Sequence, residues 1–271
     1  EYDIYVCGSD QIWNPLIYKE KTFDPAFFAE FARSGKRVAY APSFGIDKIP
    51  KDKRDELKRY LSRFECLSSR EEQGERIIRE ISGKEAVTVL DPTLLLNGIE
   101  WSAFSVDSEI KDPYLLCYFI TDGRKYSDYV SALSEKLNLP VVSLCGSRRV
   151  VSCTRRTVLD AGPREFLGLF QNAAFVCTDS FHGTVFSINF NRDFCCFETA
   201  AKNGPKVNSR LHNILGKLNL KHRSFTLTSG METFNKNING IAESINYKEV
   251  DNLLDEERKM SLKYLEDSLK L

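Results

Sequence analysis

The chain has 271 residues, which is enough for one large or two ordinary domains that each bury their own core. Its 38 basic residues equal its 38 acidic residues, which argues against a nucleic-acid coat or a polybasic membrane binder, and its 42% hydrophobic content argues against disorder. No stretch approaches the ~18 uninterrupted apolar residues of a membrane span, and the amino terminus lacks a signal-peptide pattern, so we expect a cytoplasmic protein without an integral membrane segment.

The first part of the chain alternates short apolar runs with amphipathic stretches, which is the pattern of an α/β protein with largely parallel sheets. Apolar residues recur at helical spacing in the amphipathic stretches and crowd together in the short runs. Strands are therefore predicted at residues 2–8, 36–41, 64–69 and 86–90, and helices at residues 51–63 and 71–81. A turn-rich segment, residues 95–101, then interrupts the pattern.

The alternation resumes beyond residue 112. Strands are predicted at residues 114–120, 139–145, 173–177 and 192–197, and helices at residues 125–137, from Pro163 onward and at residues 208–220. With a boundary near residues 106–112, the chain divides into a first domain, residues 1–107, and a second domain, residues 108–250. Residues 251–271 form an amphipathic helix that could pack back on the first domain.

The eight cysteines lie mostly in apolar, strand-like runs. They lack the CxxC and CxxH spacings of metal sites, and the chain is too long for a fold held by disulfides. We expect reduced thiols in the core. A catalytic cysteine is the alternative, but it is disfavoured in such apolar surroundings.

In open α/β sheets, ligands bind in loops that follow the carboxyl ends of strands, and the first such loop contains Gly8, Ser9, Asp10 and Gln11. Gly8 would allow a close backbone approach, and Ser9 and Gln11 would supply hydrogen bonds. Asp10 would orient a hydroxyl or take its proton. The alternative is an Asx-turn that caps the next segment.

Two further loops follow predicted strands in the first domain. Arg70 stands between a strand and a helix, where its guanidinium and the backbone N–H groups would favour an anion. Ser69 and Glu72 also fit a capping box, so Arg70 could equally lie at an ordinary helix start. Asp91 precedes a proline, and we interpret it as a turn former.

The richest loop follows the strand predicted at residues 173–177. It combines a histidine, an acid, two hydroxyls and a glycine ahead of a helix-like run: Asp179, Ser180, His182, Gly183 and Thr184. The histidine would serve as a general acid or base, and the N–H groups of Gly183 and Thr184 would favour a phosphate. A histidine with a purely structural role is the alternative.

Basic residues follow this loop along the chain. Lys206 and Arg210, near the start of a predicted helix, are candidate anion contacts, whereas His212 has the spacing of a surface residue. Residues 148–223 hold 12 basic residues against 5 acidic ones, so the second domain suits a small anionic ligand. No paired motif predicts a metal site, and the glycine motifs of dinucleotide and P-loop proteins are absent.

Together these motifs resemble the polysaccharide pyruvyl transferase family. The resemblance is carried by five segments in the family's order: VCGSDQIWNP (6–15), YAPSFG (40–45), LSSREEQG (67–74), VLDPTLLL (89–96) and TDSFHGTVFSINF (178–190). It implies two Rossmann-like domains that face a cleft, as in GT-B glycosyltransferases. Typical members begin with a strand and a helix ahead of the GSDQ motif, so the resemblance implies a first domain truncated at its amino terminus.

The reaction that the resemblance implies is the transfer of pyruvate from phosphoenolpyruvate to two hydroxyls of a sugar, giving a ketal and phosphate. The acceptor would be a cell-surface polysaccharide or its lipid-linked precursor, which would allow a peripheral position at the inner face of the membrane. The donor is a substrate, and no cofactor or metal is implied.

By position, Arg70 matches the family's arginine in the S-x-R-E motif and would contact the donor. His182 matches the family's histidine, the candidate acid or base. Ser180 stands where well-studied members have arginine, and Lys206 or Arg210 would replace that contact. Two alternatives stay open: a nucleotide-sugar glycosyltransferase of the same fold, and a catalytically silent member that binds a glycan or a partner protein.

Overall fold

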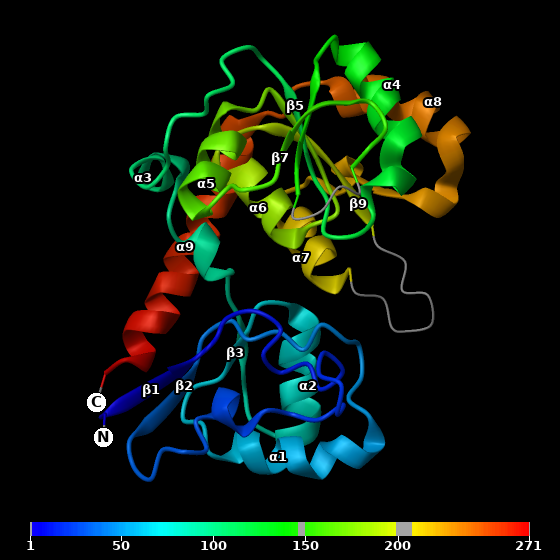
Figure 1. Ribbon diagram of the computed structural model, residues 1–271. Coiled ribbons are helices and arrows are strands. Elements are labelled where there is room, and N and C mark those ends of the chain that lie inside the picture. Colours follow the sequence, from blue (N-terminus) through cyan, green and yellow to red (C-terminus); the bar gives the residue numbers. More distant parts are fainter. Residues whose placement is uncertain (1, 146–149, 199–207, 271) are drawn as a thin grey trace. The chain divides into compact units, whose positions relative to one another are not determined.

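The computed structural model describes residues 2–145, 150–198 and 208–270 (Figure 1). Contacts between residues divide the chain into two compact units. Unit 1 comprises Glu1–Leu95, Ala201–Ile214 and Asp251–Leu271, and unit 2 comprises Leu96–Ala200 and Leu215–Val250. The chain passes between the units within helices α7 (Ser209–Lys217) and α9 (Tyr247–Ser268).

Unit 1 contains two pairs of parallel strands. Strand β1 (Ile4–Cys7) pairs with β2 (Lys36–Ala39), and the short strands β3 (Ser68–Ser69) and β4 (Val87–Thr88) pair with each other. A bridge between Val38 and Cys66 joins the two pairs. All of these strands run in the same direction, so the loops that follow them emerge at one edge, as expected for an α/β unit.

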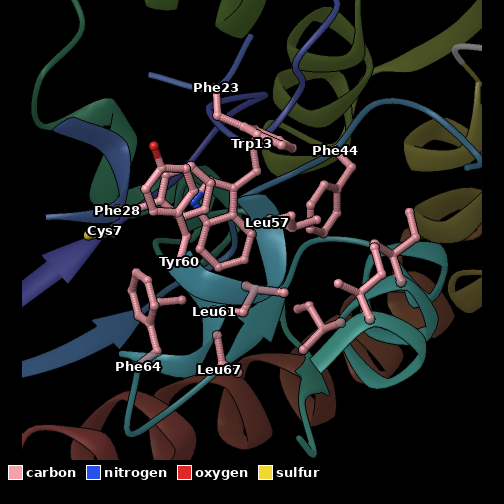
Figure 2. Close-up of a cluster of buried hydrophobic side chains, with 14 of the residues drawn as sticks. Cys7, Trp13, Phe23, Phe28, Phe44, Leu57, Tyr60, Leu61, Phe64 and Leu67 are labelled. Carbon is pink, nitrogen blue, oxygen red and sulfur yellow. The ribbon is translucent and has the colours of Figure 1, made fainter. Parts of the chain in front are cut away.

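Two helices cover the core of unit 1, α1 (Arg54–Ser62) and α2 (Glu72–Ser82), both at predicted positions. Their apolar faces pack on an aromatic cluster around the fully buried Trp13 (Figure 2). The Trp13 ring stacks on Phe28 with ring centroids 5.2 Å apart, and Phe28 stacks on Tyr60 of α1 at 4.4 Å. Large rings bury much apolar area, so this cluster anchors the loop after β1.

The C-terminal part of α9 belongs to unit 1. The Tyr264 hydroxyl donates to the Ala39 carbonyl of β2 at 2.9 Å, and the Ser261 hydroxyl accepts from the Leu90 amide at 2.9 Å. The Arg258 guanidinium donates to the Leu94 carbonyl at 2.7 Å. These contacts tie the last helix to two loops of the first segment.

Unit 2 contains a six-stranded parallel sheet in the order β10-β9-β8-β5-β6-β7. Its strands are β5 (Leu115–Tyr118), β6 (Val141–Leu144), β7 (Thr154–Val158), β8 (Phe175–Thr178), β9 (Asp193–Glu198) and β10 (Ser224–Thr226). Strand order reverses between β5 and β8, which makes that junction the topological switch point of the sheet. The predicted parallel α/β architecture is therefore present.

Helices α4 (Ser127–Leu137), α5 (Pro163–Asn172) and α6 (Phe181–Asn189) connect the strands of unit 2. Helices α3 (Gly98–Ser102) and α8 (Gly230–Ala242) were not predicted, nor were the strands β7 and β10. Strand β7 lies at the sheet edge, and its sequence TRRTV lacks the apolar run that marks a buried strand.

The first segment of unit 1 ends after Leu95, earlier than the predicted boundary near residues 106–112. The intervening residues pack on unit 2. A Cβ atom added to Gly98 would lie 2.2 Å from the Asn189 carbonyl oxygen, and the Trp101 ring meets the Phe186 ring edge-on at 5.3 Å. The turn-rich segment therefore starts the second unit, because α3 needs α6 to bury its apolar side.

The eight cysteines carry free thiols, five of them buried, in agreement with the predicted core thiols. Among the described residues, none of the helices combines the length and the apolar character needed to cross a membrane.

Candidate functional site

Loops after two strands of unit 1 bring together most of the predicted site residues of the first domain. Ser9, Asp10 and Gln11 follow β1, and Arg70 follows β3. The first turns of α7 add Arg210, whose guanidinium lies 3.9 Å from the Asp10 carboxylate. Arg210 was assigned to the second domain, but the chain returns to unit 1 before this residue.

Arg70 is the centre of this group. Its side chain is 2% exposed, and its guanidinium donates to the Asp91 carboxylate at 2.5 Å and to the Asp10 carboxylate at 3.2 Å. The other oxygen of Asp91 accepts from the amide and hydroxyl of Thr93, at 3.0 and 2.6 Å. Asp91 therefore forms the predicted turn and also balances a buried charge, a role that the sequence did not indicate.

Arg210 is held by the loop after β1. With its amide oxygen turned toward the guanidinium, Gln11 accepts from both terminal nitrogens of Arg210, at 3.1 and 2.9 Å. Burial lowers the pKa of Arg210, and the positive charge of Arg70 lowers it further. The Asn213 amide of the same helix donates to the Arg70 carbonyl at 3.4 Å, which fixes α7 beside Arg70.

Gly8 and Ser9 make packing contacts within unit 1, and their predicted contacts with a ligand stay predictions. A Cβ atom at Gly8, where φ is +145°, would lie 1.8 Å from the Tyr40 carbonyl oxygen, so only glycine fits beside β2. The Ser9 hydroxyl donates to the Ala41 carbonyl at 2.9 Å. Both residues hold the loop that presents Asp10, whose side chain is 66% exposed.

Glu71 is a site residue that sequence reasoning missed. Its carboxyl is buried beneath the group, and the Ser43 hydroxyl donates to its Oε1 at 2.7 Å. Burial raises the pKa of Glu71, against the opposing effects of Ser43, Arg70 and Arg210. Its position next to Arg70 in LSSREEQG was the available signal, but the sequence gives no indication that Glu71 turns inward.

In unit 2, the predicted histidine loop follows β8 at the switch point of the sheet, where open α/β sheets bind ligands. The Asp179 carboxylate is engaged there by the loop after β5. It accepts from the amides of Ile120 and Thr121, at 2.7 and 3.2 Å, and from the hydroxyls of Thr121 and Tyr126. Asp179 therefore joins two loops, and its predicted contact with substrate stays a prediction.

The N–H groups predicted to bind phosphate are engaged within α6. Ser180 is the N-cap, and its hydroxyl accepts from the Gly183 amide at 3.2 Å, while its carbonyl accepts from the Thr184 amide at 3.0 Å. A Cβ atom at Gly183 would lie 2.3 Å from the Thr178 hydroxyl oxygen, so this glycine allows the helix to pack on β8. A phosphate would have to displace the Ser180 cap.

His182 lies in the first turn of α6, half-buried, with its ring edge-on to that of Phe181 at 5.3 Å. Its role as an acid or base stays a prediction. Lys206 lies outside the described residues. Within residues 2–145, 150–198 and 208–270, no three His, Cys, Asp or Glu side chains gather in a way that could hold a metal ion.

The predicted residues thus form two groups, one in each unit. The unit 1 group places an exposed carboxylate, Asp10, beside two largely buried guanidinium groups, those of Arg70 and Arg210. Buried guanidinium groups with fixed positions suit the recognition of a carboxylate or a phosphate. The carboxylate can accept a proton from a hydroxyl that lies beside such an anion.

Solved structures similar to this chain include two UDP-GlcNAc 2-epimerases and MurG. The UDP-GlcNAc 2-epimerase from Neisseria meningitidis, bound to UDP-GlcNAc, is 8% identical with a TM-score of 0.51, over 90% of this chain and 72% of that one. The corresponding Methanocaldococcus jannaschii epimerase is 11% identical with a TM-score of 0.48, over 81% and 68%. MurG from Acinetobacter baumannii is 5% identical with a TM-score of 0.49, over 86% and 71%.

The likeness to the Neisseria enzyme establishes the fold, an α/β fold of the GT-B type with Rossmann-like units, as the resemblance implied. No curated protein sequence matches the chain. The family model described as polysaccharide pyruvyl transferase matches residues 1–200, which include Asp10, Arg70 and His182. The chain therefore belongs to the polysaccharide pyruvyl transferase family, as its motifs indicated.

Proposed function

We propose that this chain transfers pyruvate from phosphoenolpyruvate to two hydroxyls of a sugar in a cell-surface polysaccharide or its precursor. The observation that carries the proposal is the family match over residues 1–200. It is supported by the unit 1 group, in which Arg70 and Arg210 lie beside an exposed carboxylate. Phosphoenolpyruvate carries a phosphate and a carboxylate, and guanidinium groups recognise both.

The reaction needs an acid and a base, for which we propose His182 and Asp10. The acid protonates the methylene carbon of phosphoenolpyruvate, which leaves positive character on the adjacent carbon. A sugar hydroxyl forms a bond to that carbon and gives its proton to the base. The carbon–oxygen bond to phosphate then breaks with its electron pair on the phosphate oxygen, which takes the proton held by the base. The second hydroxyl attacks the same carbon to close the ketal and gives its proton to the group that acted as the acid, which restores that group.

Thermal unfolding with millimolar phosphoenolpyruvate tests donor binding, since a ligand that binds only the folded state raises the unfolding temperature. We expect a rise for the unaltered chain and for His182→Gln, and a smaller rise for Arg210→Gln. Phosphate release from phosphoenolpyruvate, with hexosides that offer a free pair of hydroxyls, tests turnover. His182→Gln should lower it by about 10²-fold or more.

Two other histidines provide matched controls. His212→Gln tests the histidine that lies two residues after Arg210, and His222→Gln tests a histidine far along the chain from His182. Both variants should keep their turnover. If a nucleotide sugar raises the unfolding temperature and phosphoenolpyruvate does not, the chain is a glycosyltransferase. If neither raises it, the chain is a silent member.

A further inference from the structure

Glu71 is a buried carboxyl that the proposed reaction does not use. It is 2% exposed at the start of α2, and the Ser43 hydroxyl donates to its Oε1 at 2.7 Å. Its Oε2 is buried and accepts no hydrogen bond from any residue that the structure describes. Burial of a carboxylate oxygen without a partner is costly, whereas a protonated carboxyl avoids most of that cost.

Arg70 and Arg210 are the positive charges that act on Glu71. Arg70 precedes it in the chain and pairs with Asp91 and Asp10, and Arg210 of α7 lies 3.9 Å from Asp10. Ionisation of Glu71 would add one negative charge near these two guanidinium groups, and protonation would remove it.

Burial is the largest influence on this carboxyl and raises the pKa of Glu71. The Ser43 hydrogen bond, the positive charges of Arg70 and Arg210, and a backbone hydrogen bond from Gly45 act in the opposite direction and only in part offset it. The geometry agrees, because one carboxyl oxygen has a donor and the other has none.

We propose that Glu71 is a positioning residue for the anionic donor, which stays protonated when the phosphate or carboxylate binds at Arg70 and Arg210. Ionised Glu71 would compete with the donor for the two guanidinium groups and place a like charge behind it. This inference rests on the proposed function. It adds a residue that acts through the arginines and does not itself touch the substrate.

The dissociation constant of phosphoenolpyruvate, measured by calorimetry over the whole pH range in which the chain stays folded, tests the inference. Affinity should fall by about tenfold as pH rises through the titration of Glu71, since one added negative charge opposes the anion. Glu71→Gln cannot ionise, so that fall should disappear. Glu72→Gln removes the exposed neighbouring carboxyl and should follow the unaltered chain.

Phosphoenolpyruvate itself titrates in this range, but its titration is the same for every variant. The difference between the affinity profiles of two variants therefore reports the effect of Glu71 alone. Inorganic sulfate, whose charge is constant there, serves as a second probe. Ser43→Ala provides a second variant, for the case that Glu71→Gln does not fold. It removes a hydrogen bond that favours the ionised form, and should move the fall in affinity to higher pH.

Parallel profiles for the unaltered chain and Glu71→Gln, or for the unaltered chain and Ser43→Ala, would overturn the inference. Failure of the proposed function looks different. In that case phosphoenolpyruvate does not bind the unaltered chain at any pH, while the sulfate profiles still report whether the charge of Glu71 acts on the two arginines.

Discussion

The ion pair between Arg70 and Asp91 shows how one residue can serve both structure and recognition. Both side chains are 2% exposed, and Asp91 also caps the turn that contains Thr93. A buried ion pair adds little stability compared with apolar residues, but the loss of one partner leaves an uncompensated charge. Asp91 therefore holds Arg70, the arginine proposed to contact the donor, in a fixed position.

Asp91→Asn should lower the free energy of unfolding by about 3 kcal/mol, because the amide keeps an oxygen for Thr93 but removes the charge that faces Arg70. Urea unfolding can be followed by Trp13 fluorescence in a Trp101→Phe background, since these are the two tryptophans of the chain. Trp13 is buried in unit 1 and reports on that unit.

Asp10→Asn is the matched control. Its carboxylate meets the same arginine but is 66% exposed, and exposed pairs contribute about 0–1 kcal/mol. Asp91→Asn should therefore lower the free energy of unfolding clearly more than Asp10→Asn does. Equal losses would mean that the Arg70–Asp91 pair is not the buried anchor of the loop.

At the scale of elements, the start of α6 shows how a small change in a motif alters a helix end. Ser180 replaces the arginine of well-studied members, and its hydroxyl caps the Gly183 amide at 3.2 Å. Ser180 therefore supplies a hydrogen-bond acceptor for an N–H group in the first turn of α6. An anion at this end would compete with Ser180 rather than find open N–H groups.

Ser180→Ala should expose the Gly183 amide and weaken the helix end by about 1 kcal/mol. We expect faster hydrogen exchange in a peptide that covers α6, as measured by mass spectrometry. Ser180→Asp supplies another capping oxygen and should restore slow exchange. Unchanged exchange in the alanine variant would show that the cap contributes nothing.

The sequence predicted elements where the local pattern decides the structure. The apolar runs became strands, and α2 was predicted to within one residue at each end. Strand β7 and helix α3 were missed, because an edge strand and a five-residue helix depend on their neighbours. Helix α8 has Phe234, Ile238 and Ile241 on one face, a helical signal that was available in the sequence.

For the candidate site, the sequence predicted which loops contribute residues, but not which distant residues contact those loops. Asp10, Arg70 and His182 were found because each follows an apolar run, where α/β sheets place ligand contacts. The return of Arg210 to unit 1 and the inward turn of Glu71 depend on contacts between distant segments. Such contacts leave no periodic signal in a single sequence.

At the scale of the whole molecule, the basic residues that lie close together in the sequence are divided between the two units. The basic excess of residues 148–223 was assigned to the second domain, yet it includes Arg210, which serves unit 1. It also includes Arg223, which is buried and donates to the carbonyls of Ile241 and Glu243, both at 2.6 Å. Part of the excess thus supports the fold.

Thiol reactivity tests the burial of the cysteines in both units. Burial raises the pKa of Cys7 to about 11 and that of Cys196 to about 12, so neither is a reactive thiolate near neutral pH. With an aromatic disulfide reagent, Cys66, Cys145 and Cys153 should react in the native protein, and the five buried thiols only after unfolding. Equal rates for all eight would contradict the packing of both cores.

The division of unit 1 into three chain segments has a consequence for its synthesis. The Leu90 amide and the Ala39 carbonyl are made early, but their partners Ser261 and Tyr264 follow 171 and 225 residues later along the chain. Every residue of unit 2 is made before Asp251. Domains usually fold in order from the amino terminus during translation. Here the unit that starts first is completed last, and the arginine of α7 joins its site only after unit 2 is largely made.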